Sequence, residues 1–132
     1  MRITSCNFMK IKDLHLHDFI FSGFCYDYAY RTVRLGGENL YLRKRVKLEF
    51  QNVIGFHMQA CGFWGGGNSM RGINPGDGDL LASYKKTVQA DDMLQFADLL
   101  DPENEFIEFE IELNSGGMLT VVCEALNAEE CD

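Results

Sequence analysis

The sequence predicts a mainly β protein, either an antiparallel β-sandwich or a partly open barrel, with one short helix. Two observations carry this prediction. Apolar and polar residues alternate over short runs, most clearly from Glu105 to Leu113, and this two-residue period is typical of a half-buried antiparallel strand. Runs rich in aromatic and β-branched residues are also separated by glycine-containing turns, as in sandwiches and barrels.

The length and composition indicate one compact domain over residues 1–132. A hydrophobic content of 46% with 12% aromatic residues argues against disorder. The apolar runs are too short to cross a bilayer and the N-terminal residues lack the apolar core of a signal peptide, so we expect a cytoplasmic protein without membrane contact. Five cysteines without CxxC spacing indicate free thiols in a reducing compartment.

Four strands are expected in the first half of the chain. Phe19 to Tyr26 and Tyr30 to Leu35 are aromatic and β-branched runs, and Gly36 to Asn39 supplies the turn that follows them. Leu40 to Phe50 then alternates basic with apolar residues, and Ile54 to Cys61 alternates again. We therefore expect the first three of these strands to form a meander, followed by a fourth strand.

The middle of the chain is expected to be less regular. Gly62 to Asp79 has turn composition, and its length indicates either a short hidden strand near Met70 to Ile73 or a functional loop. Leu80 to Val88 is expected to be a strand. Asp91 to Leu100 has apolar residues at helical spacing and a proline soon after it, which predicts the one short helix.

A hairpin is expected near the C-terminus. Glu105 to Leu113 and Met118 to Leu126 flank the turn residues Asn114 to Gly117, and both flanks have strand composition. The polar residues Ala128 to Asp132 are then expected to form a frayed acidic tail.

Charge is distributed very unevenly along the chain. The first 86 residues hold all twelve Lys and Arg with seven Asp and Glu (12 minus 7, or +5), whereas Thr87 to Asp132 holds thirteen Asp and Glu and no Lys, Arg or His. The net charge of −8 disfavours nucleic acid and favours a basic protein partner. The candidate acidic binding residues are Asp98, Asp101, Glu103 and Glu124.

Part of this charge separation has an internal explanation. Two of the predicted strands carry opposite charges with the same two-residue rhythm, and cross-strand ion pairs between them would fix their register. The residues concerned are Arg43, Arg45 and Lys47 on one strand and Glu108, Glu110 and Glu112 on the other.

The metal-type ligands cluster only at His15, His17 and Asp18. In an extended segment His15 and His17 project to one face, close enough to share an ion. The alternative is that His17 and Asp18 form the turn before the first strand, with the Asp18 side chain bonded to local amides. Asp77-Gly-Asp79 lacks the other ligands of a calcium loop and is expected to be a turn.

Trp64 is the one tryptophan of the chain and lies beside three glycines. Its side chain is either an interface anchor or, as we favour, a lid folded back on the core. The glycines are not a phosphate-binding loop, because no Lys-Ser or Lys-Thr pair follows them.

Several short motifs together resemble a family. They are Leu16 to Asp18 opening a strand, Leu48 to Val53 ending the basic strand, the Trp64-Gly65 loop and the closing hairpin segment Phe109 to Gly117. The arrangement resembles small uncharacterised bacterial β-domains, some of which look like immunity proteins of polymorphic toxin systems. The resemblance implies protein binding and implies no catalytic residues.

The leading hypothesis is therefore a soluble, non-enzymatic binding protein, in its sharpest form an immunity-type inhibitor that presents an acidic surface to a basic protein partner. One alternative is a metal-dependent enzyme centred on His15, His17 and Asp18. Another is a structural module that forms homodimers through a sheet face or edge. We expect no cofactor.

Overall fold

The structure is a computed structural model, and it describes residues 1–62, 67–91, 99, 101 and 103–132. Two helices and nine strands occur in this described part of the chain. In chain order they are β1 (Arg2–Ile3), the 3-10 helix η1 (Ser5–Asp13), β2 (Ile20–Asp27), β3 (Thr32–Asn39), β4 (Lys44–Gln51), β5 (Gly55–Gln59), β6 (Met70–Pro75), α1 (Asp79–Asp91), β7 (Ile107–Leu113), β8 (Met118–Cys123) and β9 (Ala125–Cys131).

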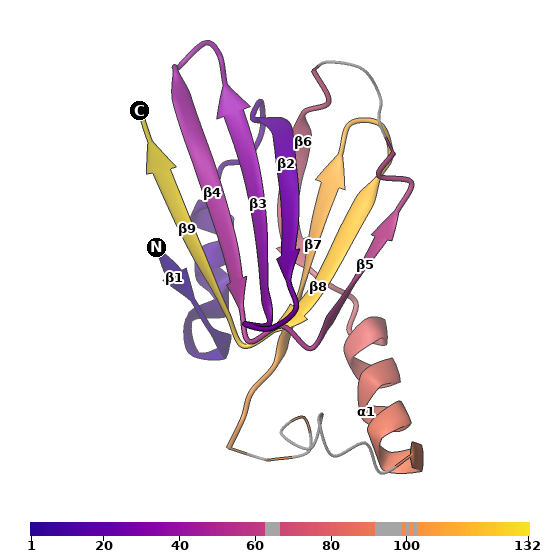
Figure 1. The fold of residues 1–132 in the computed structure, drawn as a ribbon. Coiled ribbons are helices and arrows are strands. Elements are labelled where there is room, and N and C mark those ends of the chain that lie inside the picture. Colours follow the sequence, from indigo (N-terminus) through magenta and orange to yellow (C-terminus); the bar gives the residue numbers. More distant parts are fainter. Residues whose placement is uncertain (63–66, 92–98, 100, 102) are drawn as a thin grey trace.

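The strands form two antiparallel sheets. The five-stranded sheet has the order β1-β9-β4-β3-β2, and the four-stranded sheet has the order β5-β8-β7-β6. Figure 1 shows the two sheets meeting at one end of the molecule and diverging toward the other. The predicted mainly β, antiparallel class is confirmed, and of its two versions the two-sheet sandwich is the one present, because the sheets do not close into a barrel.

Two chain segments pass together from one sheet to the other. The amide of Ile54 donates to the carbonyl of Val122 at 2.9 Å, and the amide of Glu124 donates to the carbonyl of Gln51 at 3.1 Å. The β4–β5 and β8–β9 connections therefore stay paired at the end where the sheets meet. On another side the amide of Met70 donates to the carbonyl of Phe19 at 2.8 Å, which joins the start of β6 to the segment that precedes β2.

The main core lies between the sheets. Phe109 of β7 makes edge-on ring contacts with Phe50 of β4 at 5.5 Å and with Phe8 of η1 at 5.2 Å. Phe50 and Phe109 are fully buried, and aromatic pairs in this geometry add to the free energy gained from burial alone. Through Phe8 and the buried Ile11, η1 becomes part of this core.

Helix α1 covers part of the outer face of the four-stranded sheet through a second cluster, which includes Val88, Ile54 and Val122 (Figure 1). The predicted strand over Leu80 to Val88 is wrong. Leu80, Tyr84 and Val88 recur every four residues, so all three lie on one face of a helix.

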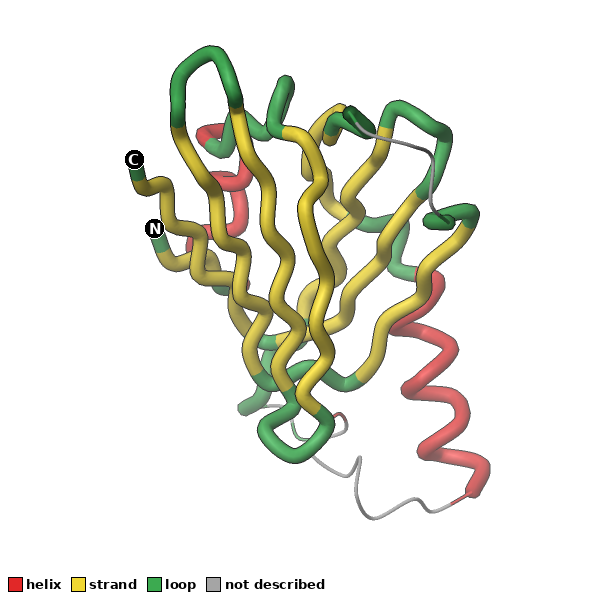
Figure 2. Tube along the Cα trace, turned by 45° about the horizontal axis from the view of Figure 1, so that its top comes forward, coloured by secondary structure: helices red, strands yellow, loops and turns green. Residues whose placement is uncertain are grey.

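The two described helices lie on opposite sides of the molecule (Figure 2). No helix in the described part of the chain is long and apolar enough to span a bilayer.

The four strands expected in the first half are all present, with shifted ends. The turn expected at Gly36 to Asn39 is wrong, because these residues continue β3. A Cβ on Gly37 would lie 2.6 Å from the Cε of Met70 and 3.2 Å from the Cβ of Phe19, so a side chain there would displace Met70 and crowd the core. The turn comes later, where the Asn39 side chain accepts hydrogen bonds from the amides of Tyr41 and Leu42 at 3.1 Å each.

The strand hidden near Met70 to Ile73 is confirmed as β6, and the C-terminal hairpin is confirmed as β7 and β8. The frayed tail over Ala128 to Asp132 is wrong, because β9 runs to Cys131 and pairs with both β4 and β1. The predicted helix over Asp91 to Leu100 falls almost wholly outside the described residues.

Candidate functional site: an acidic hollow at the start of helix α1

Three carboxylates gather where β7 meets the segment that leads into α1. One oxygen each from Asp77, Glu108 and Glu110 lies within 4.8 Å of the others. Glu108 and Glu110 are two residues apart on one strand, so both project from the outer face of the four-stranded sheet. Asp77 joins them because β6 pairs with β7 and the chain turns back at the end of β6.

Glu108 has a structural role in this group. It is only 5% exposed, and its carboxylate accepts hydrogen bonds from the amides of Gly78 at 2.7 Å and Leu81 at 3.0 Å. These amides belong to the start of α1, where backbone N–H groups lack partners within the helix and where negative charge is favoured. A Cβ at Gly76 would overlap an oxygen of this carboxylate, so any other residue there would displace the Glu108 side chain. Glu108 therefore holds α1 on the sheet.

Glu110 is half-buried and differs from Glu108 in its electrostatics. The pKa of Glu110 is raised, first by desolvation and then by repulsion from the Asp77 carboxylate. A hydrogen bond from the Asp77 amide partly offsets this increase, and the charges of Glu108 and Glu112 add to it. Among the described residues no ion pair involves Glu110 or Asp77. A cation placed beside them would relieve the repulsion.

A hollow of about 340 Å³ opens next to these carboxylates, and we call it the acidic hollow. His57, Thr120 and Glu110 form one row across β5, β8 and β7 at its base. Its lining residues are His57, Gln59, Asp77, Asp79, Leu80, Ser83, Glu110, Met118 and Thr120. Helix α1 and the turn before it form one wall, and the outer face of the sheet forms the other.

The chemistry available in the acidic hollow is that of cation binding. Carboxylate oxygens are the ligands that Ca²⁺ and Mg²⁺ prefer and that Lys and Arg side chains pair with. His57 and Ser83 line the same hollow, but among the described residues no hydrogen bond joins His57 to Ser83 or to a carboxylate. The organised nucleophile, base and orienting group of a hydrolase are therefore not assembled here.

The predicted metal ligands lie elsewhere. His15 and His17 are exposed, and the Nδ1 of His17 lies 3.1 Å from an Asp18 carboxylate oxygen. Both imidazoles line a groove that also contains Lys12 and Arg71, whose positive charges disfavour a metal ion. Within the described chain, the three-carboxylate cluster is the one group of three or more such ligands, and it includes neither histidine.

The predicted acidic binding residues are not brought into the acidic hollow where they are described. Asp101 and Glu103 are exposed, and the Asp101 carboxylate accepts a hydrogen bond from the Glu103 amide at 2.9 Å, closing a local turn. Glu124 is half-buried at the β8–β9 junction. Trp64 and Asp98 lie outside the described residues.

The expected pairing of the basic and acidic strands is wrong. Strand β4, which carries Arg45 and Lys47, lies between β3 and β9, while β7 lies in the other sheet between β6 and β8. The acids beside the basic strand are instead Glu38, 3.5 Å from Arg45, and Glu130, 3.9 Å from Lys44. The basic strand therefore leaves the acidic hollow unneutralised.

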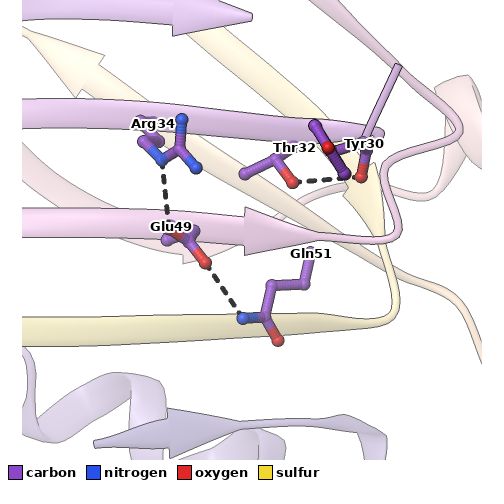
Figure 3. A network of polar contacts seen from close by, with 5 residues as sticks. All are labelled: Tyr30, Thr32, Arg34, Glu49 and Gln51. Carbon is purple, nitrogen blue, oxygen red and sulfur yellow. Dashed lines mark hydrogen bonds and ion pairs between the residues drawn. The ribbon is translucent and has the colours of Figure 1, made fainter. Parts of the chain in front are cut away.

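A separate polar network covers the outer face of the five-stranded sheet. The Arg34 guanidinium donates to the Glu49 carboxylate at 3.1 Å, and the Gln51 amide donates to the same carboxylate at 3.0 Å (Figure 3). The hydrogen bond from Gln51 and then that from Arg34 lower the pKa of Glu49. A mixed-charge hollow of about 620 Å³ lies beside this network. Its charges are of both signs, and Arg34 and Glu49 neutralise each other, which makes it a weaker candidate site than the acidic hollow.

The fold and the candidate site together describe a two-sheet antiparallel β protein with a hollow lined by carboxylates beside an outer helix. Comparisons of this chain with known protein families, with curated proteins and with solved structures gave no match. The sequence patterns did not predict the acidic hollow. Asp77-Gly-Asp79 was interpreted as a turn only, and its proximity to β7 depends on the pairing of β6 with β7.

Proposed function

We propose that this protein is a binding protein whose acidic hollow accepts a cationic side chain of a basic protein partner. The observation that carries the proposal is the crowding of Asp77 and Glu110 beside Glu108 without a cation among the described residues. A Lys or Arg from a partner would relieve this repulsion on binding. Complementary charge of this kind increases association rate and specificity more than raw affinity.

An immunity-type inhibitor is the form of this function that we favour. The net charge of −8 supports a basic partner, and the absence of an assembled catalytic group among the described side chains of the acidic hollow supports a non-enzymatic role. All five cysteines are free, which supports our placement of the protein in a reducing, cytoplasmic compartment.

The proposal is tested by affinity capture from an extract of the source cell. The variant D77N/E110Q removes two charges from the acidic hollow but keeps side-chain oxygens that can accept the hydrogen bonds from the Asp79 and Asp77 amides. E129Q/E130Q is the matched control, because it removes two exposed charges from β9 in the other sheet. We expect low-salt capture of a basic protein by wild type and control, reduced about tenfold in D77N/E110Q, as for loss of a charge pair.

The expected interaction weakens at high salt, because exposed charges are screened within about 10 Å at 0.1 M salt. Capture by D77N/E110Q equal to that of the wild type would overturn the assignment to this hollow. Parallel titrations with CaCl2 and with MgCl2 test whether these carboxylates bind a divalent metal ion instead of a cationic side chain of a partner. Tight divalent-ion binding that is lost in D77N/E110Q, without capture of any protein, would replace the proposal with a metal site.

A further inference from the structure

A second surface of opposite charge lies along the edge strand β6. A groove of about 350 Å³ separates η1 and the residues that follow it from β6, and every residue from Arg71 to Pro75 lines it. The half-buried Phe8 and Leu14 and the exposed Met9 contribute apolar side chains to this groove. It therefore has the form of a channel that runs beside the outer strand of a sheet.

The groove is basic in a protein that is acidic overall. Lys12, Arg71, His15 and His17 line it and are all exposed. None of its lining residues is Asp or Glu, and Lys12 and Arg71 form no ion pair within the described part of the chain. A carboxylate contacts a lining residue of the groove: an Asp18 oxygen lies 3.1 Å from the Nδ1 of His17.

The edge of β6 offers backbone groups to this groove. The Gly76 amide donates to the Glu108 carbonyl at 2.9 Å, so after the register shift that follows Met70 the N–H and C=O groups of Gly72 and Asn74 also point to β7 in the antiparallel ladder. Ile73 lies between two such positions, so its N–H and C=O point to the groove side. Pro75 has no N–H to offer, as is common at an edge strand.

We infer that this groove binds an extended acidic segment of a partner protein, laid along β6. Its carboxylates pair with Lys12 and Arg71, its backbone bonds to that of Ile73, and its alternate apolar side chains cover the half-buried Phe8 and Leu14. This is strand addition to a sheet edge, in which the main chain supplies affinity and alternate side chains supply specificity. The site does not depend on the acidic hollow, which accepts the opposite charge.

The test uses a fluorescein-labelled hexapeptide of alternating Glu and Val, titrated with the full-length protein by fluorescence polarisation at low salt. We expect saturable binding, weakened about tenfold or more in K12E/R71E, and weakened about tenfold or more when the peptide carries Lys in place of Glu. K85E/K86E is the matched control: it makes the same change of charge on exposed positions of α1 and is expected to stay within about threefold of the wild type.

Equal weakening by K12E/R71E and K85E/K86E would overturn the inference, because binding would then follow only the net charge. Full displacement by inorganic phosphate at matched ionic strength would also overturn it, because a simple anion would then suffice. In an extended peptide the N–H groups of alternate residues point to the same edge, so one peptide is N-methylated at its valines and another at its glutamates. Undiminished binding of both peptides would exclude strand addition. Thermal unfolding checks each variant, and K12Q/R71Q replaces K12E/R71E if that variant is unfolded.

Discussion

Glu108 and Glu110 are two residues apart on one strand, project to one side of the sheet and have different roles. Glu108 is buried and accepts two amide hydrogen bonds from the start of α1. Glu110 is half-buried, faces the acidic hollow and has a pKa raised by burial and by its acidic neighbours. The alternation of β7 in the sequence places both on the charged face. The position of α1 distinguishes Glu108, which has a structural role, from Glu110, for which we propose a binding role.

Replacing Glu108 by alanine is expected to destabilise the protein. The change leaves the amides of Gly78 and Leu81 without their acceptor, and an unsatisfied buried donor costs about 1–3 kcal/mol. Urea unfolding measures the loss, and hydrogen exchange at the Gly78 and Leu81 amides locates it. Glu112→Ala on the same strand is the control, for which we expect a change within about 0.5 kcal/mol.

Glu110→Gln is expected to stabilise the protein at neutral pH. The pKa of Glu110 is raised above its ordinary value of 4.5, so the folded state holds this proton more tightly than the unfolded state. The ionised form therefore lowers stability above the raised pKa, and this cost disappears as the pH falls through the raised pKa and below 4.5. Unfolding curves at about pH 4 and about pH 7 measure the difference. A variant less stable than wild type at neutral pH would show that the crowding at Glu110 is not repulsive.

At the scale of elements, the sequence was most informative where strand periodicity was strong. The β7–β8 hairpin and the strands of the first half were found from alternation and turn residues. Leu80 to Val88 was misassigned because its apolar and aromatic residues resemble those of a strand. The helical spacing of Leu80, Tyr84 and Val88 becomes evident only in the structure, where all three pack in the second cluster. β9 was missed because its last residues are polar, although Ala128 is buried and its carbonyl accepts a hydrogen bond from the N-terminal amine at 2.8 Å.

β9 is therefore expected to be essential to stability. Leu126 is fully buried within it, and replacement of such a leucine by alanine costs about 2–5 kcal/mol. Leu40→Ala is the matched control, because Leu40 is 69% exposed and its truncation should change stability by less than about 0.5 kcal/mol. Chemical denaturation compares the two variants, and equal effects would contradict the central position of β9.

At the scale of the whole molecule, the basic and the acidic segments of the sequence lie on different surfaces of the fold. The cations of β4 lie near acids of β3 and β9 rather than those of β7. The carboxylates of the acidic hollow therefore face outward without a basic strand beside them. Charge composition indicated a basic partner, but the place of contact depends on sheet order, which the sequence alone did not provide.

Hydrogen exchange of the protein with and without its captured basic partner tests the central claim most directly. We predict that binding slows exchange around the acidic hollow, in residues 57–59, 77–83 and 118–120. The D77N/E110Q variant should lose this protection, whereas E129Q/E130Q should keep it. Protection confined to residues 101–105 and 124, with the hollow unchanged, would contradict the account.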